Sequence, residues 1–377
     1  MLKCFKYRLY PTRQQACAFE QMLETHRRLY NGGLAERTDA WRSEQRSVTY
    51  GQQSAVLKDR RKNDPYITAT NFSSCQATLR RLDKSFQNFF RRVKAGQKPG
   101  YPRFKGRDRF DSVWFGSYGD GCKLNGHRLV YFQHIGKVKV KLHRPVEGAI
   151  KTMAFKRETE KWFVLFTCEL PDTPAKSIRS VVGIDMGLKS FLVTSDGETF
   201  DPPRFYRNAQ AKLRRLQRAV SRKKRGSNRR QKAVRQLAKM QWHISNQRRD
   251  FHHKTALSLV SEYDLISHEA LNIKGLCRTR LAKSIHDAGW GQFLTILTSK
   301  AVEAGVSVIA VNPANTSQMC SRCGKLPSVK KKLSDRLHKC EHCDYTADRD
   351  FNAAENILGL GLSLQASTCA DVGQCVA

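Results

Sequence analysis

The run Val181-Val182-Gly183-Ile184-Asp185-Met186-Gly187 decides the fold of the second half of this chain. It places a carboxylate inside an apolar strand bounded by glycines. The continuation, residues 188–197, predicts a second strand that is entered through a tight turn and closed by Asp-Gly. A buried strand has little use for an ionised carboxylate unless a cation or a charged partner lies beside it. Asp185 is therefore a candidate metal ligand.

Two more acids have similar settings. Glu269 ends the predicted strand 263–269, and Asp350 opens the predicted helix 348–357. A strand Asp, a distant strand-end Glu and a late helix-start Asp are typical of two-metal sites that cleave phosphodiesters. In such sites carboxylates hold two divalent ions roughly 4 Å apart, one of which activates water while the other stabilises the leaving oxygen. We expect Asp185, Glu269 and Asp350 to form a catalytic site of this kind.

The charge of the chain indicates a large polyanionic partner. The 377 residues carry a formal net charge of +35, and the pI is about 10.1. The segment 204–249 contains 17 Lys or Arg and no Asp or Glu. Its thin apolar stripe predicts two helices joined near residues 223–227, and such a face repels itself unless phosphates lie against it. No apolar run reaches membrane-spanning length, and the charged start 1–8 is unlike a signal peptide, so nucleic acid is favoured over a membrane.

The first half of the chain predicts strands on both sides of a helical block. A strand is expected at 3–10, and Thr12 with Gln15 forms a capping-box pattern for a helix that Gly32-Gly33 would break or bend. A second amphipathic helix is expected at 72–93, followed by strands from about 111 to 170. The pattern favours a β-module with a helical insertion, ending near a linker at 171–174.

The loop 98–110 interleaves aromatic residues with cations, a composition that can stack on bases while it contacts phosphates. We favour binding over an ordinary solvated loop. The predicted nucleic-acid contacts are Tyr101, Arg103, Phe104, Lys105, Arg222, Lys223, Lys224, Arg225, Arg229 and Arg230. Another helix is expected to begin at 284–293, where capping or packing roles are favoured over catalysis for His286 and Asp287.

Twelve cysteines include one compact group, Cys320-x2-Cys323-x16-Cys340-x2-Cys343. Two knuckles at this spacing offer four thiolates to one tetrahedral zinc, as in a zinc ribbon. With four protein ligands no coordination position stays open, so a structural zinc is expected. The remaining cysteines are expected to be reduced cytosolic thiols.

These motifs together resemble the TnpB family, the OrfB-type proteins of bacterial and archaeal insertion sequences, which are related to type V CRISPR nucleases. The resemblance rests on five segments: 183–187, 268–271, Ile285-x-Asp287-Ala288-Gly289-Trp290, the CxxC pair, and Asp348-Arg349-Asp350-x-Asn352-Ala353-Ala354-x-Asn356-Ile357. The start at 7–12 is also similar to the amino terminus of the family.

The resemblance implies an α/β multidomain fold. A RuvC-like, RNase H-like nuclease domain would occupy residues 178–313 and 347–361, with a zinc-ribbon insert at 314–346. A wedge β-barrel would comprise 1–10 and 101–172, with a helical recognition domain inserted at 11–100. The tail 362–377 matches nothing in the family pattern and is expected to be disordered.

The resemblance also implies an RNA-guided DNA endonuclease that cleaves double-stranded target DNA next to a short flanking motif. Asp185, Glu269 and Asp350 would bind Mg²⁺, and Asp348 would support the site without binding metal. The implied partners are a guide RNA from the element and, functionally, its separate transposase, in a nucleoid-associated, cytoplasmic, prokaryotic setting. Spacing alone leaves other readings open: a transposase that acts without RNA, a non-catalytic regulator of the element, or a compact CRISPR effector.

Overall fold

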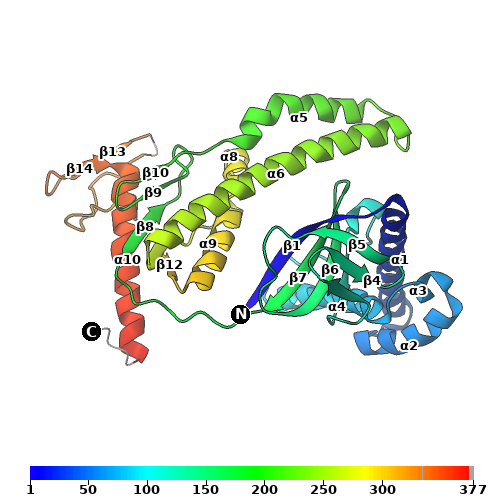
Figure 1. Ribbon diagram of the computed structural model, residues 1–377. Coiled ribbons are helices and arrows are strands. Elements are labelled where there is room, and N and C mark those ends of the chain that lie inside the picture. Colours follow the sequence, from blue (N-terminus) through cyan, green and yellow to red (C-terminus); the bar gives the residue numbers. More distant parts are fainter. Residues whose placement is uncertain (333, 373–377) are drawn as a thin grey trace. The chain divides into compact units, whose positions relative to one another are not determined.

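The computed structural model describes residues 1–332 and 334–372, with side chains described as far as residue 367. The chain forms two compact units, Met1–Pro171 and Asp172–Ala377, drawn in Figure 1. The boundary falls in the Pro-rich segment from which the sequence predicts a linker. No helix within the described residues combines the length and the apolar content that crossing a membrane requires.

The first unit is built on an antiparallel sheet of seven strands in the order β2-β6-β7-β1-β5-β4-β3. The strands are β1 (Leu2–Tyr10), β2 (Ser112–Phe115), β3 (Cys122–Asn125), β4 (Leu129–Phe132), β5 (Gly136–Lys141), β6 (Ala149–Glu158) and β7 (Lys161–Glu169). The central strand β1 alternates buried Phe5, Tyr7 and Leu9 with polar residues, as the sequence predicts. In the described part of the chain the strand order ends at β2 and β3, so the expected wedge β-barrel has the form of a half-barrel sheet.

The helices of this unit lie between β1 and β2 in the sequence, which agrees with the predicted helical insertion. They are α1 (Arg13–Glu44), α2 (Tyr50–Asn63), α3 (Pro65–Thr68) and α4 (Phe72–Lys94), followed by the 3-10 turn η1 (Arg107–Arg109). The predicted capping box is present, with the Thr12 side chain accepting from the N–H of Gln15. Phe19 of α1 stacks on Trp162 of the sheet with ring centroids 4.9 Å apart, so helix and sheet share one core.

Of the two effects expected from Gly32-Gly33, a break or a bend in the first helix, the break is wrong, because α1 continues through both residues to Glu44. The reason for a glycine here is packing rather than chain reversal. A Cβ added to Gly33 would lie 3.1 Å from Cδ2 of Leu82 in α4 and 3.2 Å from Nε2 of Gln53 in α2. Gly33 therefore lets three helices approach closely.

The second unit contains a five-stranded sheet in the order β10-β9-β8-β11-β12. Its strands are β8 (Val181–Asp185), β9 (Leu192–Thr194), β10 (Thr199–Phe200), β11 (Leu265–Glu269) and β12 (Ser307–Val311). β8 pairs antiparallel with β9 and parallel with β11, and β11 pairs parallel with β12. Three antiparallel strands followed by two parallel ones are the arrangement expected for the RNase H-like domain.

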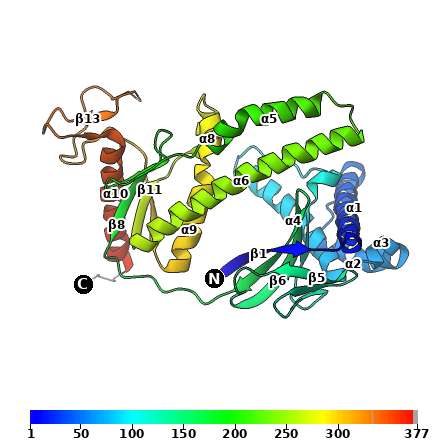
Figure 2. The same cartoon turned by 45° about the horizontal axis from the view of Figure 1, so that its top comes forward.

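Helices cover both faces of this sheet. They are α5 (Phe205–Ser221), α6 (Asn228–Glu262), α7 (Ile273–Leu276), α8 (Ala282–Ala288), α9 (Trp290–Ala304) and α10 (Arg349–Val372). Val182, Ile184 and Ile266 share one core with α6 and α9. On the opposite face, α10 lies along β8 and β11 (Figure 2).

Three details of this unit bear on the sequence predictions. The acid-free segment 204–249 forms α5 and the first part of α6, joined by a turn at 222–227, so the two-helix prediction is confirmed. The helix expected from residue 284 is divided, because Gly289 with φ 70° ends α8 and precedes α9. Residues 362–372, expected to be disordered, continue α10, and 373–377 lie outside the described residues.

Candidate active site and metal centre

Strand alternation places Asp185 and Glu269 on one face of the second sheet. Ile184 and His268 are partners in the parallel pairing of β8 and β11, so the residues that follow them end the two strands side by side. Side chains alternate between the faces of a strand. Because Val182, Ile184 and Ile266 point into the α6–α9 core, Asp185 and Glu269 belong to the face that α10 covers.

Two glycines allow α10 to lie very close to that face. A Cβ on Gly183 of β8 would come within 2.1 Å of the Ala354 carbonyl oxygen, and one on Gly361 of α10 within 1.8 Å of Ser267 Oγ. Asp350 lies one helical turn before Ala354, and its charge acts on Asp185 at the end of β8. Close backbone packing therefore brings the third carboxylate to the same end of the sheet as the other two.

The Asp185 carboxyl group is buried, and the charges of the other two acids act on it. Burial first, and then the charges of Glu269 and Asp350, raise the pKa of Asp185 to about 8. Burial also raises the pKa of Glu269, and the Thr316 hydroxyl, which donates to its Oε1, opposes that shift. Like-charged acids crowded together in this way create a site that favours cations.

The neighbours of Asp350 define the rest of the site. The Asp348 side chain accepts from the Asp350 N–H at 2.8 Å and so caps the start of α10. Arg336 Nη1 lies 3.9 Å from Asp350 Oδ1. The Asp348 carboxylate therefore bonds the backbone at the start of α10, and its charge also adds to the rise in the pKa of Asp185.

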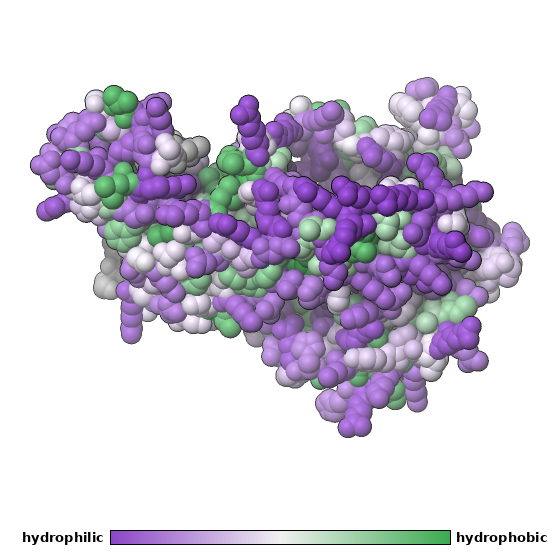
Figure 3. All heavy atoms as spheres, turned by 90° about the horizontal axis from the view of Figure 1, so that it is seen from above, coloured by the Kyte–Doolittle hydropathy of each residue, from purple (hydrophilic) through white to green (hydrophobic). Residues whose placement is uncertain are grey.

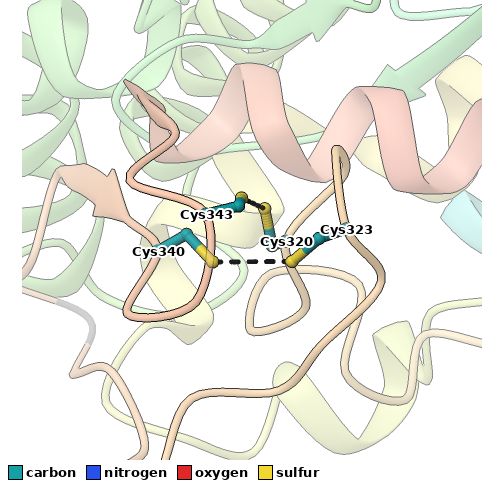
Figure 4. Close-up of side chains that lie close together, drawn as sticks. All are labelled: Cys320, Cys323, Cys340 and Cys343. Carbon is teal, nitrogen blue, oxygen red and sulfur yellow. Dashed lines mark hydrogen bonds between the residues drawn. The ribbon is translucent and has the colours of Figure 1, made fainter.

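The four motif cysteines converge, as Figure 4 shows. Cys320 Sγ lies 3.7 Å from Cys343 Sγ, and Cys323 Sγ lies 3.6 Å from Cys340 Sγ. A tetrahedral zinc with Zn–S bonds of about 2.3 Å has sulfur–sulfur edges of about 3.8 Å, so the cluster fits this ion. The short hairpin of β13 (Leu337–Lys339) and β14 (Thr346–Asp348) brackets the second pair, as in a zinc ribbon.

Among the described residues, the cysteines are the group of three or more potential ligands whose donor atoms all lie within 4.8 Å of one another. The three carboxylates are more widely spaced than this.

Hydrogen bonds join the cysteine cluster to the carboxylates. The Ser321 N–H donates to Asn352 Oδ1 at 2.9 Å, and Asn352 donates back to the Met319 carbonyl at 2.8 Å. One turn later, Asn356 donates to the carbonyl oxygens of Thr316 and Met319. Because Thr316 also contacts Glu269, the segment that leads into the first CxxC pair helps to fix both α10 and Glu269.

The basic residues predicted to bind nucleic acid lie on exposed segments of both units. Arg222, Lys224, Arg225 and Arg229 are exposed at the turn between α5 and α6 and at the start of α6, and Lys223 and Arg230 are half-buried there. Figure 3, which looks down on these helices from the top of Figure 1, shows hydrophilic side chains over this face.

In the first unit the loop after α4 exposes Tyr101, Arg103 and Phe104. The backbone of Lys105 is fixed by Asn31, whose side chain exchanges two hydrogen bonds with it at 2.8 and 3.0 Å. The loop therefore presents its side chains from a fixed backbone.

Asp287 has the capping role that sequence reasoning favoured, but it caps a different helix. Its carboxylate accepts from the N–H groups of Tyr206 and Arg207 at 2.8 and 3.0 Å, at the start of α5. The residue before α5, Arg204, provides no side-chain cap of its own. His286 is exposed.

Comparison with known proteins identifies the family. Three family models match: the Cas12f1-like TNB domain over residues 290–357, the OrfB "Probable transposase" model over 165–280, and an OrfB "Helix-turn-helix domain" over 1–46. In this structure the last of these segments is one strand and one long helix, β1 and α1.

A Streptomyces pristinaespiralis protein, provisionally named an RNA-guided DNA endonuclease, is 35% identical over 98% of this chain and 91% of its own length. The chain belongs to the TnpB family. The family member InsQ of Escherichia coli, also provisionally named an RNA-guided DNA endonuclease, is 29% identical over 96% of this chain and 92% of its own. The solved structure of the mini RNA-guided endonuclease Cas_phi3 has the same fold, with a TM-score of 0.51 at 8% identity over 96% of this chain and 92% of that chain.

Sequence reasoning missed several residues that shape the site in this TnpB family chain. Gly183 is part of the strand motif, but only the structure shows that α10 needs it. Asn352 and Asn356 are one helical turn apart in the helix that Asp350 opens. Residues four apart lie on the same face of a helix, so this spacing predicts one shared polar face. Thr316 carries no comparable signal in the sequence.

Proposed function

We propose that the chain is an RNA-guided DNA endonuclease of a transposable element, and that it cleaves DNA by metal-dependent hydrolysis at Asp185, Glu269 and Asp350. The observation that carries the proposal is geometric: β8 and β11 end side by side at Asp185 and Glu269, and α10, which begins with Asp350, packs directly on Gly183 of β8. The charges of Glu269 and Asp350, which help to raise the pKa of Asp185, support it. The family relatives named as RNA-guided DNA endonucleases support the guided activity.

The carboxylates would hold two Mg²⁺ ions, which when bound supply an activated water and a stabilised leaving oxygen. Asp185 and Glu269 are fixed by paired strands, and Asp350 by a capped helix, so their geometry needs little reorganisation. Thr316 restrains one oxygen of Glu269. Arg336, half exposed beside Asp350, is placed to contact a phosphate that approaches this carboxylate.

Zinc in the cysteine cluster would have a structural role. Four thiolates complete a tetrahedral shell, so no position remains for substrate. We assign the cluster to a zinc ribbon at 314–346 that positions the start of α10. The other proposed domains keep the ranges expected from the sequence, except that the helix at the end of the nuclease domain extends to Val372.

The proposed partners are a guide RNA from the element and a double-stranded DNA target. The net charge of +35 and the acid-free α5–α6 face support binding to a long polyanion. In RNA-guided enzymes the protein contacts backbone shape and a short flanking motif while base pairing selects the sequence. A DNA target implies the nucleoid-associated location expected from the sequence.

The experiment is to purify the protein with its bound RNA, sequence that RNA and change its guide segment. Cleavage should move to the DNA that matches the new guide. Reversal of Lys223, Lys224, Arg229 and Arg230 to Glu should reduce RNA retention while the thermal melting temperature changes little.

The second candidate is a transposase that acts without RNA. The family model over residues 165–280 is described as a probable transposase, but the relatives named RNA-guided DNA endonucleases favour the first candidate. Such an enzyme would cut or join DNA at the element ends equally well after its RNA is removed. That result would overturn the guided activity and leave the carboxylate site in place.

A further inference from the structure

A cavity of about 540 Å³ in the first unit is lined by aromatic side chains from three separate segments. Trp41 comes from the last turn of α1, Phe89 and Phe90 from α4, and Tyr101 from the loop that follows α4. Trp41 and Phe90 are each 54% exposed, and Tyr101 is 48% exposed. None of the residues that line this cavity belongs to the proposed metal sites or to the α5–α6 face, so the proposed function gives the cavity no role.

The aromatic wall is an ordered structure. The Phe89 ring lies 5.2 Å from Phe90 and 5.4 Å from Tyr101, both in edge-to-face contact. Tyr101 also contacts Phe86 at 5.6 Å, and its hydroxyl lies 3.3 Å from Thr38 Oγ1. Rings held in this way expose apolar faces at low entropic cost to a ligand, because they are already immobilised.

A buried cation lines the same cavity. Arg37 is 8% exposed, and its guanidinium lies 5.1 Å from the Phe86 ring. Its Nε donates to Gln53 Oε1 at 2.9 Å, and its Nη1 donates to Asp83 Oδ1 at 3.0 Å. Its Nη2 is buried and has no hydrogen-bond partner among the described residues. The cation is therefore held against the aromatic wall and contributes positive charge behind it.

The surroundings select the class of ligand. Arg46 lines the cavity, and the last turn of α4 adds the exposed cations Arg91, Arg92 and Lys94 directly after the two phenylalanines. Aromatic faces bordered by cations are typical of sites that stack nucleic-acid bases and contact their phosphates. Bases in a duplex are already stacked and paired, which leaves the unpaired base as the natural occupant.

We propose that this cavity binds one unpaired nucleobase of a bound nucleic-acid strand. The base would stack against the exposed rings of Trp41, Phe90 and Tyr101, and the exposed cations at the end of α4 would contact the neighbouring phosphates. The proposal rests on the proposed function in one respect, that nucleic acid is the partner. It adds a base-binding site to the previously expected contacts at Tyr101 and Phe104.

The test uses the full chain, purified free of nucleic acid, and short single-stranded RNA and DNA oligonucleotides that each carry one 5-iodouracil. Ultraviolet irradiation should crosslink the modified base to peptides that contain Trp41, Phe90 or Tyr101. The double variant Trp41→Ala, Tyr101→Ala should bind the same oligonucleotides at least about fivefold more weakly, since stacking on aromatic side chains contributes about 1–3 kcal/mol per base.

The matched control is Trp114→Ala, because Trp114 is 45% exposed on β2 and does not line the cavity. It should bind as the wild type does.

The outcomes separate two failures. If the wild-type protein binds neither RNA nor DNA, the proposed function itself is overturned. If it binds both while the double variant matches Trp114→Ala and the crosslinks map elsewhere, only the cavity assignment is overturned. An altered oligomeric state of the double variant with unchanged oligonucleotide affinity would make the cavity a protein interface, which also overturns the proposal.

Discussion

Replacing Gly183 with alanine tests whether the close packing of α10 on the sheet places Asp350. The substitution leaves all three carboxylates in the chain and adds one methyl group on the face that α10 covers. That methyl carbon would lie 2.1 Å from the Ala354 carbonyl oxygen, 2.6 Å from the Leu358 nitrogen and 2.9 Å from the Leu358 Cβ. All three contacts are with α10, and two are with its backbone, so rotation of a side chain cannot relieve them.

The magnitude follows from these distances. Ordinary contacts of a Cβ begin near 3.4 Å, so α10 must move by about 1 Å relative to β8, and overpacking of this kind costs about 1–3 kcal/mol in stability. Because Asp350 lies one turn from the contact, it moves with the helix. A misplacement of about 1 Å in a catalytic group can lower the rate about 100-fold.

The assay compares Gly183→Ala with Gly359→Ala on the same preparations. Gly359 lies in α10 with nothing within 4 Å of an added Cβ, so alanine there should stabilise the helix by up to about 1 kcal/mol and leave cleavage unchanged. We expect Gly183→Ala to retain nucleic-acid binding, melt at a lower temperature and cleave at about 1% of the wild-type rate. Full cleavage by Gly183→Ala would refute the claim that this contact sets the site.

Three further predictions concern the zinc cluster, a buried histidine and the capping aspartate. Cys320→Ser should lose the single zinc and most of the cleavage activity, because the segment that Cys320 anchors is hydrogen-bonded to α10. The control Cys17→Ser, at an exposed cysteine, should lose neither. Metal analysis and cleavage assays test this, and a zinc-free protein that still cleaves DNA would contradict it. His26 is fully buried, and burial lowers its pKa to about 3, so the unfolded chain binds a proton below about pH 6.5 that the folded chain does not. Stability should therefore fall by about 1.4 kcal/mol per pH unit below pH 6 from this residue, and His26→Gln should show a shallower slope in chemical unfolding; equal slopes would exclude the effect. Asp287→Ala should speed amide hydrogen exchange at the start of α5, because the Asp287 carboxylate caps that helix. His286→Ala, a change at the exposed neighbouring residue, should not. Equal exchange in the two variants would show that the cap contributes nothing.

Much of this fold was predictable because local patterns and the family resemblance agree. The capping box at Thr12, the two helices of the acid-free segment and the strands that end in Asp185 and Glu269 all follow from local chemistry. The cysteine spacing predicted the metal cluster, since the ligands lie in two CxxC turns whose geometry depends little on the rest of the chain.

The residues that sequence reasoning missed depend on tertiary contacts. In sequence, glycines such as Gly33 and Gly183 are usually interpreted as helix breakers or turn residues. In the structure they instead allow close packing between elements that are far apart in the chain. Asp287 has the pattern of a local cap, and its actual partners lie about 80 residues away. The aromatic cavity combines the end of α1, the end of α4 and a loop, so no single window of sequence predicts it.

The most direct test of the proposed function is guided cleavage by three single variants, Asp185→Ala, Glu269→Ala and Asp350→Ala. Each is compared with wild type for RNA-directed DNA cutting in Mg²⁺ and for affinity to RNA and target DNA on the same preparation. We predict that each variant loses cleavage and keeps nearly wild-type affinity, because each change removes a metal ligand and no phosphate-contacting cation. Substantial cleavage by any one of the three would contradict the assignment of that residue, and cleavage by all three would contradict the carboxylate site itself.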